Sequence, residues 1–159
     1  MANQIALAAQ VRPGDEVIVG QDAHCWRFEC GALAALAGAQ TAMIPGDGRF
    51  TGAEVRAAYK PSTYYLAPSR VVAVENTHNM GGGTVWRRPQ LDDVIAAARA
   101  LGLAAHLDGA RLWNAAVATG DRVGAVRLAD PGQLRGHEIE RFFRHNLTPF
   151  RPDAGLLSV

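Results

Sequence analysis

The stretch HLDGARLWNAA, residues 106–116, decides how this chain is interpreted. An apolar run over residues 103–107 leads into it and is typical of a buried strand. Asp108 follows at once, then Gly109, and then an alanine-rich run that favours a helix. A buried strand that ends in a carboxylate needs a cation or a strong hydrogen-bond donor beside it, because an isolated buried charge is costly.

Three partners for Asp108 are compatible with the sequence. Arg111 lies three residues further on and could pair with Asp108 while the carboxylate caps the following helix. A metal ion could also neutralise it. The third partner is the protonated ring nitrogen of pyridoxal 5′-phosphate (PLP), which acts as an electron sink only while an acidic partner keeps that nitrogen protonated. The residues alone leave these alternatives open.

Strand and helix patterns alternate along the first 120 residues. Strands are expected at 16–19, 41–44, 71–75 and 103–107, and helices at 2–11, 26–37, 52–59, 91–101 and 110–119. Thr51 and Glu54 have the spacing of a capping box. The alternation predicts an α/β fold with a mainly parallel sheet and flanking helices. Ligands of such sheets bind outside the carboxyl ends of the strands, where Glu75 and Asp108 lie.

The chain changes character after Gly120. Residues 121–159 are charged, are interrupted by prolines and contain one helical candidate, residues 137–145. We therefore expect two parts: a partial large domain over residues 1–120, and an atypical tail of low order over residues 121–159.

Composition excludes several classes of protein. The net charge of +1 gives no electrostatic case for nucleic acid or an anionic membrane. No apolar run approaches the length of a membrane span, and the N-terminus lacks the basic segment of a signal peptide. Cys25 and Cys30 form no disulfide framework and suit a reducing compartment. We expect a cytoplasmic protein.

Two further motifs contain candidate site residues. In VENTHNMGGGTVW, residues 74–86, polar groups including His78 end an apolar strand, and three glycines permit a tight turn. Their spacing fits neither a dinucleotide fingerprint nor a P-loop. In DAHCWRFECG, residues 22–31, one histidine and two cysteines are too few for a structural zinc site, so no metal is expected. His24 could instead lay its flat ring on an aromatic cofactor.

Three segments together closely resemble the threonine aldolases: MANQIALAAQVRPGDEVIV, then ENTHN with GGGTVW, then HLDGARLWNAA. That family consists of PLP-dependent carbon–carbon lyases of fold type I, the aspartate aminotransferase-like fold. The resemblance covers about residues 1–120 and implies an incomplete fold type I large domain. It also implies cleavage of L-threonine or allo-threonine into glycine and acetaldehyde, by a homo-oligomer (dimer or tetramer) with sites at subunit interfaces.

The resemblance implies roles for four residues. Asp108 would hold the pyridinium nitrogen of PLP. Arg111 would lie beside the cofactor and bind the substrate carboxylate. His24 would stack on the ring near the substrate hydroxyl, and His78 would assist proton transfer from that hydroxyl.

The chain departs from the family pattern in three places. The family's Ser-Gly-Thr segment, which holds the PLP phosphate, precedes the Met-Ala-Asn with which this chain opens. No Ser-Lys-Gly motif with a Schiff-base lysine follows Gly120. We expect this chain to lack the small C-terminal domain of the family. Lys60, the only lysine, sits in a turn context before a proline and is not expected to replace that residue.

We therefore expect a threonine aldolase fragment that is inactive alone. The alternatives are a non-catalytic remnant that at most pairs with an intact subunit, and another fold type I lyase, such as a β-eliminating enzyme. A frameshift near residue 120 together with an internal start at Met1 would explain both ends. A coding sequence without Ser-Lys-Gly codons downstream in any frame would contradict that hypothesis.

Overall fold

The computed structural model describes residues 1–120 and contains one parallel sheet. Its strands are β1 Glu16–Gly20, β2 Gln40–Ile44, β3 Ser69–Glu75 and β4 Ala104–Asp108. They lie in the order β2-β1-β3-β4, and every neighbouring pair is parallel. The predicted α/β fold with a parallel sheet is confirmed. The tail expected over residues 121–159, with its helical candidate at 137–145, lies outside the described residues.

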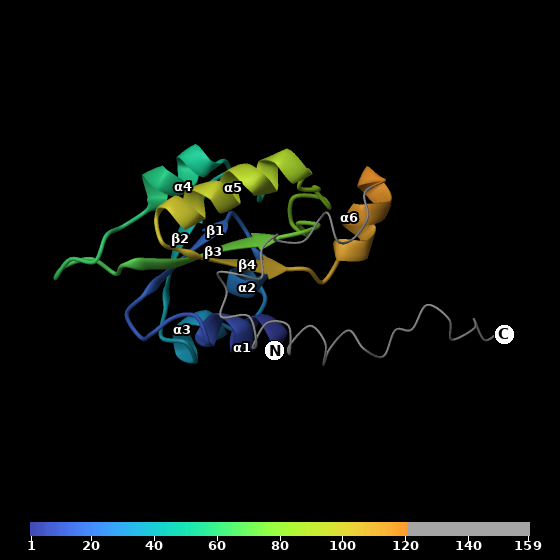
Figure 1. Cartoon of the computed structure of the whole chain (residues 1–159). Helices are drawn as coiled ribbons and strands as arrows, with labels where there is room; N and C mark the ends of the chain where they lie inside the picture. The colour runs from blue at the N-terminus through green and yellow to red at the C-terminus, as the bar shows by residue number, and fades with distance from the viewer. Residues whose placement is uncertain (121–159) are drawn as a thin grey trace. The chain divides into compact units, whose positions relative to one another are not determined.

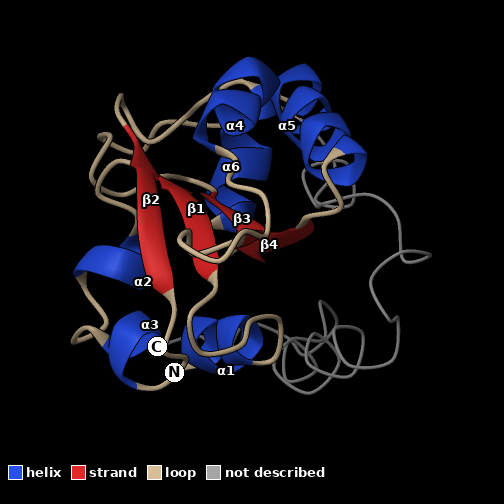
Figure 2. Cartoon of the chain, turned by 90° about the vertical axis from the view of Figure 1, so that its left-hand side faces the viewer, coloured by secondary structure: helices blue, strands red, loops and turns tan. Residues whose placement is uncertain are grey.

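Helices cover both faces of this sheet. They are α1 Ala2–Ala8, α2 His24–Arg27, α3 Ala32–Ala35, α4 Gly52–Ala58, α5 Arg88–Ala100 and α6 Leu112–Thr119. α4 and α5 lie on one face, and α1 and α3 lie on the other (Figures 1 and 2). The predicted capping box is present at the start of α4, where the Thr51 and Glu54 side chains each bond the other's backbone N–H.

The single helix expected over residues 26–37 is wrong. Two short helices, α2 and α3, replace it, because Cys30 and Gly31 between them have φ angles of +55° and +68°. These angles are left-handed and cannot continue an α-helix. The break turns Glu29 toward α1, where the Asn3 amide donates to its carboxylate. The break thus places Glu29 in the site described below.

Apolar side chains bury both faces of the sheet. Ile18, Val72 and Val74 pack with the apolar side of α5, and Val17, Val19, Val71 and Ala73 pack with α1 and α3. Consecutive residues of β1 are therefore all buried, as expected for a strand covered on both sides. Burial of each valine or isoleucine side chain contributes about 1.5–3 kcal/mol.

The alternation of side chains fixes where the carboxylates at the ends of the strands point. Val71 and Ala73 of β3 face α1, so Glu75, two residues further on, faces the same side. Glu75 and Asp108 are register partners at the ends of β3 and β4. Both carboxylates are therefore directed to the α1 and α2 side of the sheet's carboxyl edge.

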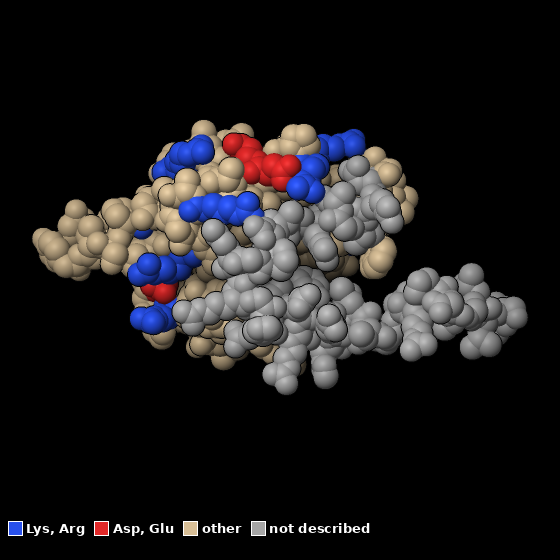
Figure 3. Space-filling view, in the orientation of Figure 1, with Lys and Arg blue, Asp and Glu red and all other residues tan. Residues whose placement is uncertain are grey.

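One face of the described part is mixed in charge. Figure 3 shows basic and acidic side chains interspersed over the coloured surface. Among residues 1–120, no helix combines the length and apolar character that crossing a membrane requires.

Candidate active site

Asp108 is held by an amide and a backbone group rather than by a cation. The Asn3 side-chain Nδ2 donates to Asp108 Oδ2 at 2.8 Å, and the Ala110 backbone N–H donates to Oδ1 at 3.2 Å. Arg111 donates instead to Glu75, and α6 has no side-chain cap. The alternative in which Asp108 caps this helix and pairs with Arg111 is therefore wrong.

Glu75 connects three of the residues selected from the sequence. This carboxylate is 3% exposed and accepts from the backbone N–H of His24 at 2.8 Å, the backbone N–H of Asn79 at 3.0 Å and Arg111 Nη1 at 3.3 Å. His78 Nε2 lies 3.6 Å from it. Glu75 was expected at the carboxyl edge but was assigned no role from the sequence. Its position among the polar residues that end β3 was the available signal.

Glu29 orients His24. His24 Nδ1 lies 3.2 Å from Glu29 Oε1, and a carboxylate can only accept a hydrogen bond, so a neutral His24 carries its proton on Nδ1. Nε2 is then free to accept a proton, and 36% of the side chain is exposed. Glu29 was not among the residues predicted for the site, because the single helix expected over residues 26–37 leaves no turn at this position.

His78 is sealed inside the site. It is 1% exposed, and its Nδ1 accepts from the Gly81 backbone N–H at 3.1 Å, so Nε2 carries the proton and faces Glu75. Gly48 has φ +90°, and a Cβ added there would lie 2.3 Å from atoms of the His78 ring. Only glycine allows this loop to cover the histidine so closely.

The site carries an excess of negative charge. Burial raises the pKa of the Cys25 thiol to about 12, and Asp108, Glu29 and Glu75 contribute to the rise. Among residues 1–120, Arg111 is the guanidinium that pairs with this group. Burial lowers the pKa of His106 to about 4, so its ring is neutral at neutral pH and does not offset the carboxylates. These three carboxylates therefore fit a cationic partner such as a protonated pyridine ring.

Metal ligation has no comparable support. Within residues 1–120, histidine, cysteine and acidic side chains form no group of three or more that could hold a metal ion.

Lys60 lies at the opposite edge of the sheet. Its Nζ bonds to Glu16, the first residue of β1, and Glu16 is the register partner of Ser69 at the start of β3. Asp108 is the register partner of Glu75 at the end of β3. Glu16, the partner of Lys60, and Asp108 therefore lie at opposite ends of β3, which is about 20 Å long. Figure 1 shows the segment between α4 and β3 on the side away from α6.

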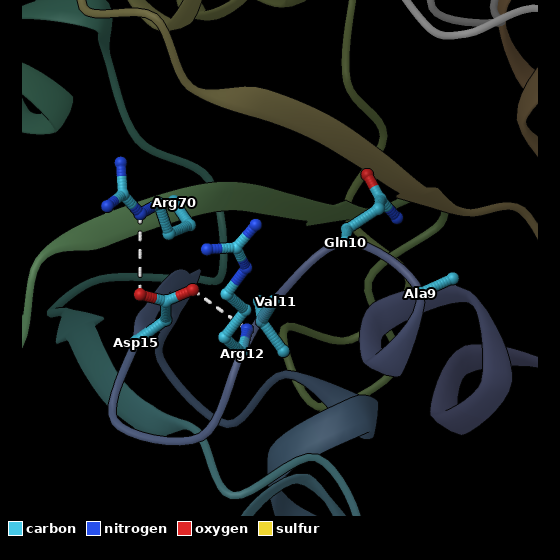
Figure 4. Close-up of a pocket in the computed structure, with 6 residues that line it drawn as sticks. All are labelled: Ala9, Gln10, Val11, Arg12, Asp15 and Arg70. Atoms are coloured by element: carbon cyan, nitrogen blue, oxygen red, sulfur yellow. Dashed lines mark hydrogen bonds and ion pairs between the residues drawn. The ribbon is translucent and has the colours of Figure 1, made fainter.

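A pocket of about 440 Å³ also lies away from the carboxyl edge (Figure 4). Asp15, just before β1, accepts from Arg70 Nε at 3.3 Å and from the Arg12 backbone N–H at 2.8 Å. This pocket contains none of the residues selected from the sequence.

Comparison with known proteins identifies the class. Residues 1–130 match the model of the family described as beta-eliminating lyase. The chain belongs to this family.

Within this class, the chain is similar to threonine aldolases. It is 39% identical over 124 residues to the low specificity L-threonine aldolase of Escherichia coli O157:H7, which covers 77% of this chain and 36% of that protein. It is 33% identical over 127 residues to low-specificity L-threonine aldolase 1 of Arabidopsis thaliana, covering 76% of this chain and 35% of that protein. The resemblance found in the sequence is confirmed.

A solved structure gives the same result. The threonine aldolase of Leishmania major is 30% identical, with a TM-score of 0.65 over 72% of this chain and 34% of that one. The fold is therefore that of part of a PLP fold type I large domain. The chain spans about a third of the length of these relatives.

Proposed function

We propose that residues 1–120 form part of the PLP site of a threonine aldolase, which cleaves L-threonine or allo-threonine into glycine and acetaldehyde. The observation that carries this proposal is the Asp108 carboxylate, held by Asn3 and Ala110 within a group of three carboxylates that one guanidinium serves. Such a group favours a ligand that brings its own positive charge. The similarity to threonine aldolases supports the choice of reaction.

Asp108 would hold the ring nitrogen of the cofactor in its protonated state. His24, at the start of α2, would lie on the ring with its exposed face. When bound, PLP supplies a sink for the electron pair released as the Cα–Cβ bond breaks. The protein's part is to orient the ring and keep its nitrogen charged.

His24 is the proposed general base. Because Glu29 fixes the proton on Nδ1, Nε2 can accept the proton of the substrate's β-hydroxyl. A carboxylate that orients a histidine and stabilises its charged form acts in the same way in catalytic triads. His78 has no exposed face, so its part in proton transfer would pass through Glu75.

Arg111 is the proposed carboxylate-binding residue. Glu75 accepts from its Nη1, which leaves other donors of the guanidinium for a substrate. A planar guanidinium binds a carboxylate through two parallel hydrogen bonds. Glu75 would thereby fix the direction in which Arg111 presents those donors.

We propose that this 159-residue chain does not turn over substrate alone, since its one lysine lies at the far edge of the sheet.

The second candidate function is a non-catalytic fragment that pairs with an intact subunit of a homo-oligomer. The exposed Trp113 and Val117 on α6 favour it, because such apolar surface is typical of interfaces. Another fold type I lyase, such as a β-eliminating enzyme, would differ from a threonine aldolase because its reaction needs no base for a substrate hydroxyl.

The free thiols of Cys25 and Cys30 support a cytoplasmic location.

A PLP titration of the purified chain tests the proposal, with Asp108→Asn as the matched variant. We expect a saturable absorbance change that Asp108→Asn abolishes, no adduct at Lys60 after borohydride reduction, and no threonine cleavage above that of free PLP. Identical titrations for the two proteins would contradict the cofactor site. A trapped adduct at Lys60 with threonine cleavage would contradict the expected inactivity.

A further inference from the structure

Asn3, in the first turn of α1, contacts two of the three carboxylates of the site. Its Nδ2 donates to Asp108 Oδ2 and to Glu29 Oε1, each at 2.8 Å. A primary amide nitrogen has two hydrogens, so these two bonds use its full donor capacity. The two acceptors lie 105 and 26 residues away in the sequence.

The two carboxylates also fix which way the amide faces. Because both accept only, the nitrogen of Asn3 must face them, and Oδ1 must face the other way. Oδ1 lies 3.1 Å from His106 Nε2, so this histidine nitrogen must be the one that carries a hydrogen. His106 is buried and neutral at neutral pH, so Nε2 carries the single N–H hydrogen of the ring and Nδ1 carries none.

We propose that Asn3 is a positioning residue that holds Asp108 and Glu29 in the orientations with which they serve the cofactor ring and His24. This inference rests on the proposed function. It links the two halves of the site, since Asp108 would hold the ring nitrogen and Glu29 orients the base. Asn3 itself would touch neither the cofactor nor the substrate.

Charge explains why the link is an amide. The two carboxylates bind the same nitrogen and are therefore close enough to repel each other. An amide lies between them, stabilises both and adds no charge, which leaves the negative potential for the ligand. Leu7, almost fully buried, anchors α1 in the core and so fixes the position of Asn3.

The binding test uses pyridoxine 5′-phosphate, which has the cofactor's ring without the aldehyde, and the full chain in a calorimeter. Asn3→Ala should weaken its binding roughly tenfold or more, because hydrogen bonds to two charged groups are lost. Asn3→Leu has a side chain of similar size that favours a helix, and it should weaken binding of the ligand equally. The control Asn114→Ala removes an exposed amide from α6 and should change affinity by less than about twofold.

A spectroscopic readout separates positioning from a loss of packing. In nitrogen-15 spectra of the ligand-free chain, we expect His106 to carry its proton on Nε2 and His24 on Nδ1. Both Asn3 variants should lose these preferences while keeping a cooperative unfolding transition.

The outcomes distinguish this inference from the proposed function. If the unmutated chain binds the ring and the Asn3 variants bind it equally with unchanged histidine tautomers, the positioning role is overturned and the cofactor site stands. If the unmutated chain does not bind the ring at all, the proposed function and this inference both fail.

Discussion

Buried carboxylates have different partners at the amino edge of the sheet, where the strands begin, and at the carboxyl edge, where they end. At the amino edge, Glu16 is fully buried and accepts from Lys60, Ser69 and Gln40. At the carboxyl edge, Asp108 is held by an amide and a backbone N–H. The first carboxylate has a cation of its own, whereas the second has none among residues 1–120.

This difference separates stability from function. A buried carboxylate that is paired with a lysine is compensated within the fold, so it has no charge left for a ligand. A group of carboxylates with too few cations is costly in the empty protein, and a bound cation offsets that cost. The amino edge is therefore a structural end of the sheet, and the carboxyl edge is its proposed functional end.

The largest expected effect is at the amino edge. Lys60→Met leaves the Glu16 carboxylate buried without its cation and should lower the free energy of unfolding by roughly 3–5 kcal/mol. Chemical denaturation measures the loss, with Arg56→Met on the exposed side of α4 as the control. Adding Glu16→Gln should recover much of the loss. A loss below about 1 kcal/mol would show that the pair is not structural.

The next effect is a dependence of stability on pH from His106. Its pKa falls from 6.5 to about 4 on folding, so between these values the unfolded chain binds more protons than the folded chain. Stability should therefore rise with pH from about 4 to 6.5, by on the order of 3 kcal/mol. The difference between the unmutated chain and His106→Gln, measured by denaturation across this range, isolates the contribution. Parallel pH profiles would contradict it.

A pair of glycines tests the sealing of His78. Gly48 and Gly82 both have positive φ, but a Cβ at Gly48 would meet the His78 ring, whereas one at Gly82 would meet nothing within 4 Å. Both alanine variants carry the backbone cost, so Gly48→Ala should be less stable than Gly82→Ala by about 2 kcal/mol. Thermal unfolding of the two variants measures the difference. Equal stabilities would mean that the loop over His78 moves freely.

Local sequence patterns predict the frame of this molecule well. The four strands, the capping box of α4 and the carboxylate at the end of β4 all follow from short stretches of sequence. Side-chain partners do not follow in the same way, because they depend on how distant segments meet. Arg111 pairs with Glu75, 36 residues away, rather than with its neighbour Asp108.

The turn at Glu29 shows the same limit. The apolar pattern of residues 26–37 fits one helix, but the left-handed φ angles of Cys30 and Gly31 break it and place Glu29 against Asn3 of α1. Asn3 and Glu29 were therefore missing from the predicted site, although His24, His78, Asp108 and Arg111 were selected. The four selected residues meet through Glu75, Glu29 and Asn3.

The most direct test of the contrast between the edges is the free energy of unfolding of Asp108→Asn, measured with and without pyridoxine 5′-phosphate. Without the ligand, we expect a change of less than about 1 kcal/mol, because an asparagine keeps one acceptor oxygen, loses one of the two bonds donated by Asn3 and Ala110, and removes a charge from the group. With the ligand, the unmutated chain should gain stability and the variant should not. A variant that is strongly destabilised when empty, yet stabilised by the ligand as much as the unmutated chain, would contradict the account.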